Sequence, residues 1–423
     1  MNNLPDLPNE LSEKRPSRRA CLTSWPLALA AGSLAIGADA QSPGRIKIIG
    51  DADGRGKYNV DLRGLSASRG SVEGRFWGTL QNALEISGWF TFDQTGGANA
   101  RLTGSLTGNA ARLRLASIDG SQSASAAKGI DVNTAQTAAY QVADQLIQGF
   151  TGKPGMFSAK LAWVSNANGK KEVWTGNALG QNFRQITREG ATCLAPTWHP
   201  TQNSVYYTSY AGGFPSIRKL DLAAGRWEKV IQFGGTNLNG TVSPDGRSLS
   251  LVLSKDGRPE IYTVDLGSKR LTRLTRSRQN APKSSPSWSP DGSQLVYVSG
   301  ENGQPHLYTL SRTGGSPRRL TRPGSVENVS PDWGPSGIVY SERVGRQYRV
   351  KVIPNGGGAV VDITPKDYAS YEEPCWAADG RHVYVSRTKG YRSKLYLLDT
   401  LGDDAIDLTK NNSGDWYSPS CSG

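Results

Sequence analysis

The stretch Ser285–Ser299 reads S-P-S-W-S-P-D-G-S-Q-L-V-Y-V-S, and degenerate copies of it recur along the C-terminal half of the chain. The position of Trp288 recurs at intervals of 44, 46, 45, 43 and 45 residues, through Trp198, Val242, Trp288, Trp333, Trp376 and Cys421. A second marker, an apolar-Thr pair that has lost its Thr in the second copy, keeps the same period through Thr187, Ile231, Thr275, Thr321, Thr364 and Thr409. The two markers agree, so this half of the chain is built from six repeats.

Each repeat predicts four short strands. The P-x-W-S segment is followed by a Pro-Asp-Gly turn, an apolar run such as Leu295–Val298, a Gly-containing turn, a run such as Leu307–Leu310, and finally R-x-L-T. Gly and Asp supply the dihedral angles that tight hairpin turns require. One such sheet cannot bury both of its apolar faces, whereas radial stacking of six sheets can. The sequence therefore predicts a six-bladed β-propeller over residues 156–423.

The ends of this region predict how the ring closes. Ser418–Cys421 is a first strand with no Pro-Asp-Gly after it, and Leu161–Val164 is a second strand with no first strand before it. We expect the two segments to pair in one blade, because closure removes the free sheet edges that would otherwise promote aggregation.

The first 40 residues have the features of a cleavable export signal. Four basic residues precede an apolar run from Leu22 to Gly37, and Ala38-Asp39-Ala40 is a small-residue cleavage site, so the mature chain is expected to begin at Gln41. Ser17–Leu22 resembles a twin-arginine signal, which leaves the export route open. Cys21 precedes the apolar run, so no lipid anchor is expected, and no later stretch is long enough to span a membrane. We expect a soluble periplasmic protein.

Residues 41–155 predict a small α/β domain. Apolar residues at helical spacing, followed by a Gly, predict helices over Phe76–Gly88 and Thr134–Phe150. Alternating apolar and polar residues predict strands at Leu102–Leu106 and Ala111–Ser117. Arg45–Ile49 (R-I-K-I-I) reads as a short extended segment. A Gly/Pro connector over 151–157 joins this domain to the propeller.

The distribution of charge along the chain does not favour binding of nucleic acid. The net charge is +13, but the basic residues are scattered through turns, with no basic helix and no aromatic-basic array. A solvated basic surface, or acidic surroundings in the cell envelope, accounts for such a charge. Three cysteines follow the leader, and whether any pair of them forms a disulfide stays open. They are Cys193, Cys375 and Cys421.

No catalytic or metal-binding constellation is predicted. The chain has no G-x-S-x-G nucleophile motif, and its three histidines, His199, His306 and His382, occupy non-equivalent positions of the repeat. Asp245, Asp291 and Asp379 lie in turns where a carboxylate accepts hydrogen bonds from its own backbone. We therefore expect no enzyme activity, no cofactor and no protein-bound metal, although a cation in the channel stays open.

The innermost strands of a propeller line its central channel. The residues three and four positions before each Trp position are therefore expected around one mouth, with the turns of Asp245 and Asp291 on the opposite face. This ring is mostly small or polar and has Glu372 and Glu373 as its only carboxylates. Its members are Leu194, Ala195, Leu238, Asn239, Ser284, Ser285, Val329, Ser330, Glu372, Glu373, Tyr417 and Ser418.

Taken in order, these segments resemble the TolB family of the Tol-Pal envelope system, whose propeller repeats are WD40-like. The resemblance rests on the export signal, on Glu85–Phe90 (E-I-S-G-W-F), on Thr151–Phe157 (T-G-K-P-G-M-F), and on the S-P-x-W-S-P-D-G repeats. It covers nearly the whole mature chain. The sequence departs from the family at Gly50–Ala67 and at the two blades that have lost Trp. It also has Ala139-Tyr140 where the family often has an Ala-His pair.

The resemblance implies a non-enzymatic, monomeric periplasmic scaffold that supports outer-membrane integrity and cell division. It implies that a Pal-like peptidoglycan-associated lipoprotein binds at the channel mouth and that a TolA-like protein binds Arg45, Ile46, Lys47, Ile48 and Ile49, a short segment that could add to a sheet edge. The mouth residues assigned to Pal-like binding are Leu194, Asn239, Ser284, Ser285, Ser330, Glu372, Glu373 and Tyr417. Two alternatives stay open: a periplasmic hydrolase or lyase, and an envelope propeller with another partner.

Overall fold

We analysed a computed structural model of the chain, which describes residues 57–92, 97–277, 281–301, 303–322 and 326–422. The predicted leader and the segment Arg45–Ile49 lie outside these residues, so their predictions stand as made. Within the described residues no helix is both long and apolar enough to pass through a membrane.

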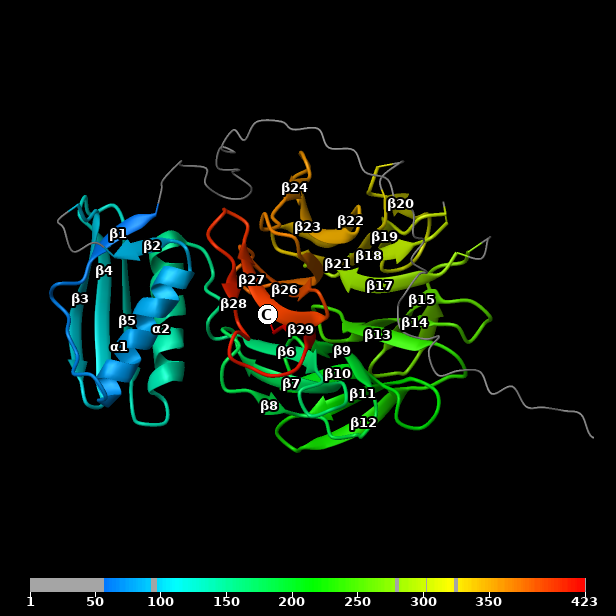
Figure 1. Cartoon of the computed structure of the whole chain (residues 1–423), viewed down its shortest axis with the longest axis horizontal. Helices are drawn as coiled ribbons and strands as arrows, with labels where there is room; N and C mark the ends of the chain where they lie inside the picture. Colours follow the sequence, from blue (N-terminus) through cyan, green and yellow to red (C-terminus); the bar gives the residue numbers. More distant parts are fainter. Residues whose placement is uncertain (1–56, 93–96, 278–280, 302, 323–325, 423) are drawn as a thin grey trace, which may run out of the picture. The chain divides into compact units, whose positions relative to one another are not determined.

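The N-terminal part is a small α/β unit (Figure 1). Its five-stranded sheet has the order β2-β1-β3-β4-β5 and its two helices are α1 and α2. The strands are β1 (Tyr58–Asp61), β2 (Phe90–Phe92), β3 (Ala100–Thr107), β4 (Ala110–Ser117) and β5 (Ser123–Gly129), and the helices are α1 (Val72–Ile86) and α2 (Ala135–Thr151). Both predicted helices and both predicted strands are present, and β1, β2 and β5 are additions.

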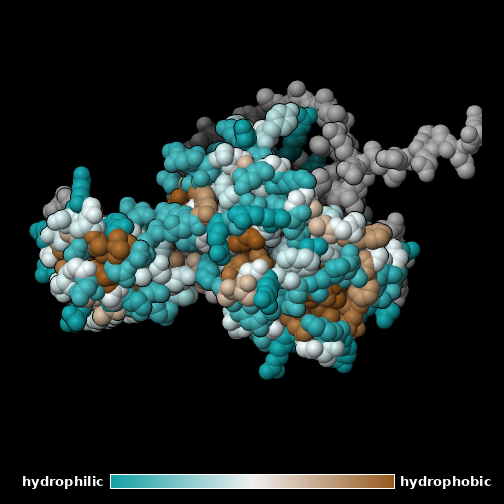
Figure 2. Space-filling view, turned by 90° about the horizontal axis from the view of Figure 1, so that it is seen from below, coloured by the Kyte–Doolittle hydropathy of each residue, from teal (hydrophilic) through white to brown (hydrophobic). Residues whose placement is uncertain are grey.

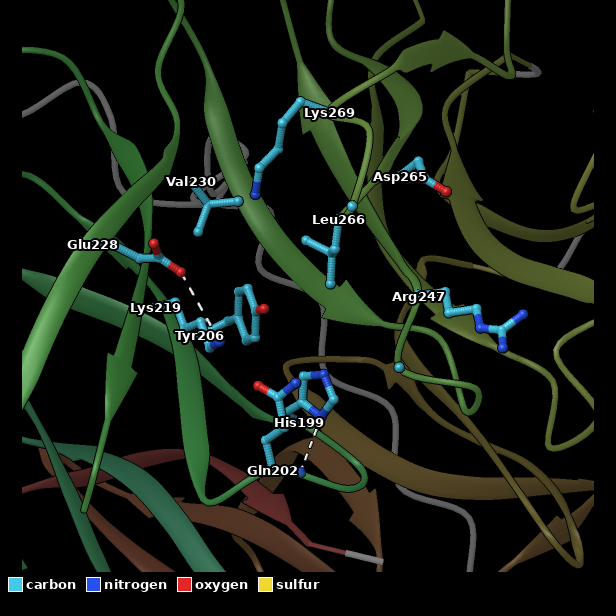
Figure 3. Close-up of a pocket in the computed structure, with 12 residues that line it drawn as sticks. His199, Gln202, Tyr206, Lys219, Glu228, Val230, Arg247, Asp265, Leu266 and Lys269 are labelled. Carbon is cyan, nitrogen blue, oxygen red and sulfur yellow. Dashed lines mark hydrogen bonds and ion pairs between the residues drawn. The ribbon is translucent and has the colours of Figure 1, made fainter. Parts of the chain in front are cut away.

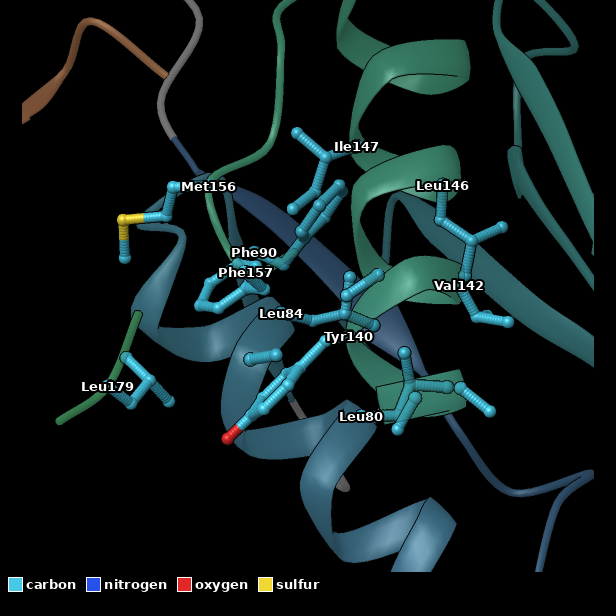
Figure 4. Close-up of a cluster of buried hydrophobic side chains, with 14 of the residues drawn as sticks. Leu80, Leu84, Phe90, Tyr140, Val142, Leu146, Ile147, Met156, Phe157 and Leu179 are labelled. Carbon is cyan, nitrogen blue, oxygen red and sulfur yellow. The ribbon is translucent and has the colours of Figure 1, made fainter. Parts of the chain in front are cut away.

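Helix α1 begins four residues before the predicted start, for a local reason. The Ser71 hydroxyl accepts a hydrogen bond from the Gly74 N–H at 3.0 Å, which caps the first turn. Helix α2 ends at Thr151 and is capped by Gly152, whose φ of 70° is accessible to glycine without strain. Figure 4 shows the apolar faces of the two helices, with Leu80 and Leu84 from α1 and Leu146 from α2 among the buried side chains.

The C-terminal part is a six-bladed propeller, as predicted, and every blade is a four-stranded antiparallel sheet (Figure 1). We number the blades from the first strand that follows the α/β unit, and we name the strands of each blade from the inside outward. Blade 1 is β29 (Trp416–Cys421), β6 (Lys160–Ser165), β7 (Glu172–Asn177) and β8 (Arg184–Gln185); blade 2 is β9 (Cys193–Trp198), β10 (Ser204–Ser209), β11 (Ser216–Asp221) and β12 (Arg226–Ile231); blade 3 is β13 (Asn237–Val242), β14 (Ser248–Leu253), β15 (Glu260–Asp265) and β16 (Leu271–Arg273). Blade 4 is β17 (Lys283–Trp288), β18 (Gln294–Ser299), β19 (His306–Ser311) and β20 (Arg318–Arg319); blade 5 is β21 (Asn328–Gly334), β22 (Gly337–Val344), β23 (Gln347–Pro354) and β24 (Val361–Asp362); blade 6 is β25 (Ser370–Trp376), β26 (His382–Lys389), β27 (Arg392–Asp399) and β28 (Ile406–Asp407).

Blade 1 closes the ring in the predicted way. Strand β29, from the end of the chain, pairs with β6, the first propeller strand, with Tyr417 opposite Val164 and Cys421 opposite Leu161. The pairing continues at its end, where Lys160 and Ser422 exchange hydrogen bonds of 2.8 Å. No unpaired inner edge is left between the first and last blades.

The Thr marker of the repeat has a physical role. In five blades its hydroxyl accepts a hydrogen bond from a backbone N–H in the first half of the third strand, at 2.7–3.2 Å. Blade 2 has Ile231 at this position, and there the fourth strand continues as β12, so that Ile231 pairs directly with Ile217. The Thr hydroxyl therefore replaces backbone pairing where the outer strand is short.

The propeller core lies between adjacent blades. The middle of each second strand carries one large apolar or aromatic side chain that is fully buried. These residues are Trp163, Tyr207, Leu251, Tyr297, Tyr340 and Val385. On the surface, hydrophobic residues gather in separate patches among hydrophilic ones (Figure 2).

Candidate functional site

The six inner strands share one irregularity that shapes the channel. Each has a register shift against the second strand, and the residue three positions before the Trp position has a φ between 48° and 55°. A left-handed conformation at a residue other than glycine is uncommon and costs of order 1 kcal/mol or more. Proline follows in five blades, at a bulge where a missing N–H leaves no pairing unmade. The left-handed residues are Ala195, Asn239, Ser285, Ser330, Glu373 and Ser418.

The left-handed residues form one end of a central cavity of about 440 Å³. A second ring, one position before Trp, also lines it, and prolines after the Trp position line its other end. The second ring consists of Thr197, Thr241, Ser287, Asp332, Cys375 and Ser420, and the terminal prolines are Pro200, Pro244, Pro290 and Pro335. All six blades therefore contribute to one small channel, in which small polar side chains alternate with prolines and Trp side chains.

The channel is lined by acidic side chains and not by basic ones. Glu373 and Asp332 are the charged side chains among its lining residues, and no Lys, Arg or His is among them. Asp332 accepts hydrogen bonds from the Ser287 hydroxyl at 3.0 Å and from the Trp376 N–H at 2.9 Å. Burial raises the pKa of the Asp332 carboxyl. Glu373 accepts a 2.8 Å hydrogen bond from the Ser418 N–H, which links blade 6 to the closing strand.

The predicted mouth residues divide into two groups. Asn239, Ser285, Ser330 and Glu373 line the cavity, whereas Leu194, Ser284, Glu372 and Tyr417, one position earlier, are absent from its lining. The bulge accounts for the division, because it turns the left-handed residue of each strand, and not the residue before it, toward the channel. Tyr417 instead lies beneath the Lys171 ammonium group, 4.3 Å from the centre of its ring.

Glu372 lies beside two other carboxylates. Burial, together with the nearby charges of Glu373 and Glu327, raises its pKa to about 7. Its carboxyl is therefore partly protonated at neutral pH. A cationic group that approached it would favour the ionised form.

The turns of Asp245 and Asp291 follow the inner strands β13 and β17, so they lie at the opposite end of these strands from the loops that lead into them. Pro244 and Pro290, directly before the two aspartates, line the end of the cavity at the Pro-Asp-Gly turns. We call this end of the propeller the turn face, and the end where a loop leads into each inner strand the loop face.

Asp332 and the rest of its ring were missed by sequence reasoning. Side chains two positions apart share one side of a strand, so the ring at three positions before Trp implied a second ring at one position before it. The residue types there (Thr, Thr, Ser, Asp, Cys and Ser) are too varied to stand out in a repeat alignment.

The histidines have structural partners. His199 Nδ1 accepts from the Thr201 and Gln202 N–H groups, His306 lies 3.2 Å from the Thr321 hydroxyl, and His382 Nδ1 lies 2.6 Å from Asp379. Within the described ranges, no group of three or more His, Cys, Asp or Glu side chains is placed to hold a metal ion. Cys193, Cys375 and Cys421 are free thiols, with Cys375 Sγ 3.3 Å from the Cys421 backbone nitrogen.

A second cavity, of about 420 Å³, lies between blades 2 and 3 (Figure 3). His199, Tyr206 and Leu266 form part of its wall, and the Lys269 side chain points toward Val230. Its charges are mixed, because Lys219 lies 3.9 Å from Glu228. The central channel is the stronger candidate, since six equivalent strands converge on it.

Comparisons with known proteins agree with this geometry. A family model described as "TolB beta propeller domain" matches residues 147–423. The "Tol-Pal system protein TolB" of Francisella tularensis subsp. tularensis is 31% identical over 157 residues, which cover 35% of this chain and 36% of that relative. The chain thus matches about a third of the length of such curated relatives.

Solved structures show the same fold. The crystal structure of TolB from Acinetobacter baumannii superposes with a TM-score of 0.75 at 22% identity, covering 87% of this chain and 97% of that one. The structure of putative TolB from Agrobacterium tumefaciens has a TM-score of 0.50 at 20% identity, covering 62% and 91% respectively.

Proposed function

Because this chain belongs to the TolB beta propeller domain family, we propose that it is a non-enzymatic periplasmic component of a Tol-Pal envelope system. In this role it binds a Pal-like peptidoglycan-associated lipoprotein through the propeller and a TolA-like protein through Arg45–Ile49. It thereby supports outer-membrane integrity and cell division.

The acidic channel is the observation that carries the propeller half of this proposal. Six strands present small polar side chains, prolines and two carboxylates around one cavity, with no basic residue among those that line it. Such a cavity favours a protruding segment of a partner that carries N–H donors or a cationic side chain. Asp332 and Glu373 are the anchors we assign, and Asn239, Ser285 and Ser330 supply further hydrogen bonds.

A titration of the purified protein with the soluble domain of a Pal-like lipoprotein tests the proposal. Changing Glu373→Gln and Asp332→Asn together keeps the side-chain shapes but replaces both carboxyl groups with neutral amides. We expect the affinity to fall more than tenfold, because a charged hydrogen bond at a desolvated contact is worth roughly 1.5–3 kcal/mol. The matched control, Glu228→Gln with Asp404→Asn, removes two carboxylates elsewhere and should leave the affinity unchanged.

Two results would overturn the channel assignment: equal loss of affinity in both double variants, or full affinity in the channel variant. Thermal unfolding of each variant separates loss of binding from loss of fold. Deleting residues 45–49 tests the other half of the proposal, since this deletion should abolish binding of a TolA-like domain and retain the Pal-like lipoprotein.

A further inference from the structure

The loop face of blades 5 and 6 differs from that of the other blades. Strands β22, β23, β26 and β27 each have eight residues, whereas the second and third strands of blades 1–4 have six. At about 3.3 Å per residue, the two hairpins remain regular for roughly 7 Å beyond the strand ends of the other blades. Each ends in a two-residue turn that begins with a left-handed glycine, Gly345 or Gly390. A left-handed residue at the first turn position is what two-residue hairpin turns require.

Exposed hydrophobic side chains gather at these tips and in the loop between them. Tyr391 occupies the second turn position of the β26–β27 hairpin and is 101% exposed. Tyr368, in the loop from β24 to β25, is 91% exposed, and Val344, at the β22–β23 tip, is 46% exposed. A single exposed hydrophobic side chain is ordinary, but three that gather on adjoining loops are a feature of interaction surfaces.

The same loops carry four exposed basic residues, Arg346, Lys366, Lys389 and Arg392. None of the four forms an ion pair with a carboxylate of the described ranges. The nearby carboxylates are already engaged, because Asp367 binds Arg387 and Glu327 lies 3.4 Å from Arg343. These four cations are therefore available to an external anion.

The three segments are held together. The Tyr348 N–H of one hairpin donates to the Ser370 hydroxyl at 3.2 Å, and Arg387 of the other donates through Nε to Asp367 at 3.0 Å. The tips and the loop thus form one preorganised surface. We call Val344, Arg346, Lys366, Tyr368, Lys389, Tyr391 and Arg392 the tip patch.

We propose that the tip patch docks on an anionic phospholipid surface. Aromatic side chains with a polar end settle at the headgroup level of a bilayer, and Lys or Arg beside them pair with anionic headgroups. A soluble polyanion would use the cations but would leave Tyr368 and Tyr391 in water. The combination of fully exposed tyrosines with unpaired cations selects the lipid surface. This docking is separate from the channel, whose cavity extends toward the turn face.

Sedimentation with lipid vesicles tests the proposal, using protein purified from a periplasmic extract. We expect binding to vesicles of equal parts phosphatidylglycerol and phosphatidylcholine, and little binding to phosphatidylcholine alone. Each Lys or Arg near an anionic leaflet is worth about fivefold in binding, so Lys389→Gln with Arg392→Gln should weaken it at least tenfold. Tyr368→Ser with Tyr391→Ser should weaken it several-fold. All four changes lie at exposed positions, so the melting temperature should be unchanged.

The matched control is Arg247→Gln with Arg270→Gln, which removes two exposed cations from the turn face and should leave vesicle binding intact. The proposal is overturned if the native protein does not bind the anionic vesicles, or if the control weakens binding as much as the tip-patch variant. Full binding by the double Tyr variant would also overturn it, because charge alone would then account for the attraction.

Discussion

At the scale of single residues, Glu372 carries a pH dependence that can be measured. Its pKa is about 7 in the folded protein, above the ordinary value of 4.5, so its ionisation in the fold destabilises the protein as the pH rises through this interval. Glu372→Gln mimics the protonated side chain. We expect this variant to equal the native protein at pH 4 and to be more stable by roughly 1–3 kcal/mol at pH 8, as measured by denaturant unfolding.

His382 should contribute to the stability of the protein through a buried charge pair with Asp379. Burial by itself would lower its pKa, but the carboxylates of Asp379 and Asp399 outweigh burial and raise it above 6.5. The stability that protonated His382 contributes is therefore present below pH 6.5 and is lost as the pH rises through its folded-state pKa. The same contact lowers the pKa of Asp379, whose contribution is lost only in acid.

His382→Gln removes this pair, and we expect it to reduce the free energy of unfolding by about 3 kcal/mol at pH 6. The penalty should shrink as the pH rises through the folded-state pKa of His382, because the native histidine then loses its charge as well. Unfolding curves of both proteins at a series of pH values from 6 upward make the comparison, and a penalty that does not change with pH would contradict the charged pair.

At the scale of elements, the closing strand β29 offers the most direct test of the fold. Deleting residues 416–423 removes β29 and leaves β6 with an unpaired inner edge. We expect the truncated protein to lose its cooperative thermal transition and to aggregate. Deleting only residues 422–423 is the control and should lower the melting temperature by a few degrees. A synthetic peptide of residues 416–423, added in excess, should restore part of the transition.

The Thr marker offers a second test at this scale. In the native protein the buried Leu395 N–H donates to the Thr409 hydroxyl at 3.1 Å. Thr409→Val keeps the side-chain shape but removes this acceptor. The expected loss is about 1–3 kcal/mol in the free energy of unfolding. Ile231→Val, at the equivalent position of blade 2, removes only a methylene group and should cost about 1 kcal/mol. Equal costs for both would show that the hydroxyl contributes packing alone.

For the whole molecule, export is a prediction that the sequence makes by itself. Ala38-Asp39-Ala40 and the preceding apolar run predict that the mature protein begins at Gln41. N-terminal sequencing of material from the periplasm should find Gln41 as the first residue. A protein that starts at Met1, or one that stays in the cytoplasm, would contradict the prediction.

The architecture was predictable because a period of about 45 residues and two half-repeats at the ends leave one way to close the ring. The lining of the channel was predictable only in part. A bulge changes which side chain faces the channel, and no residue type in the repeat marks it, so the sequence alone could not show that Glu373 lines the cavity while Glu372 does not. Asp332 was missed because its ring has no common residue type.

The pairing of the chain's end with the first blade also sets the timing of its synthesis. Lys160 and Ser422 are 262 positions apart, so β6 leaves the ribosome long before its partner strand exists. At about 5–20 residues per second, this interval lasts roughly 13–52 s. During that time the nascent chain has an open strand edge that nothing in its own sequence can cover. The ring can therefore close only after the last residues of the chain have been made, which places blade 1 last in the order of blade completion.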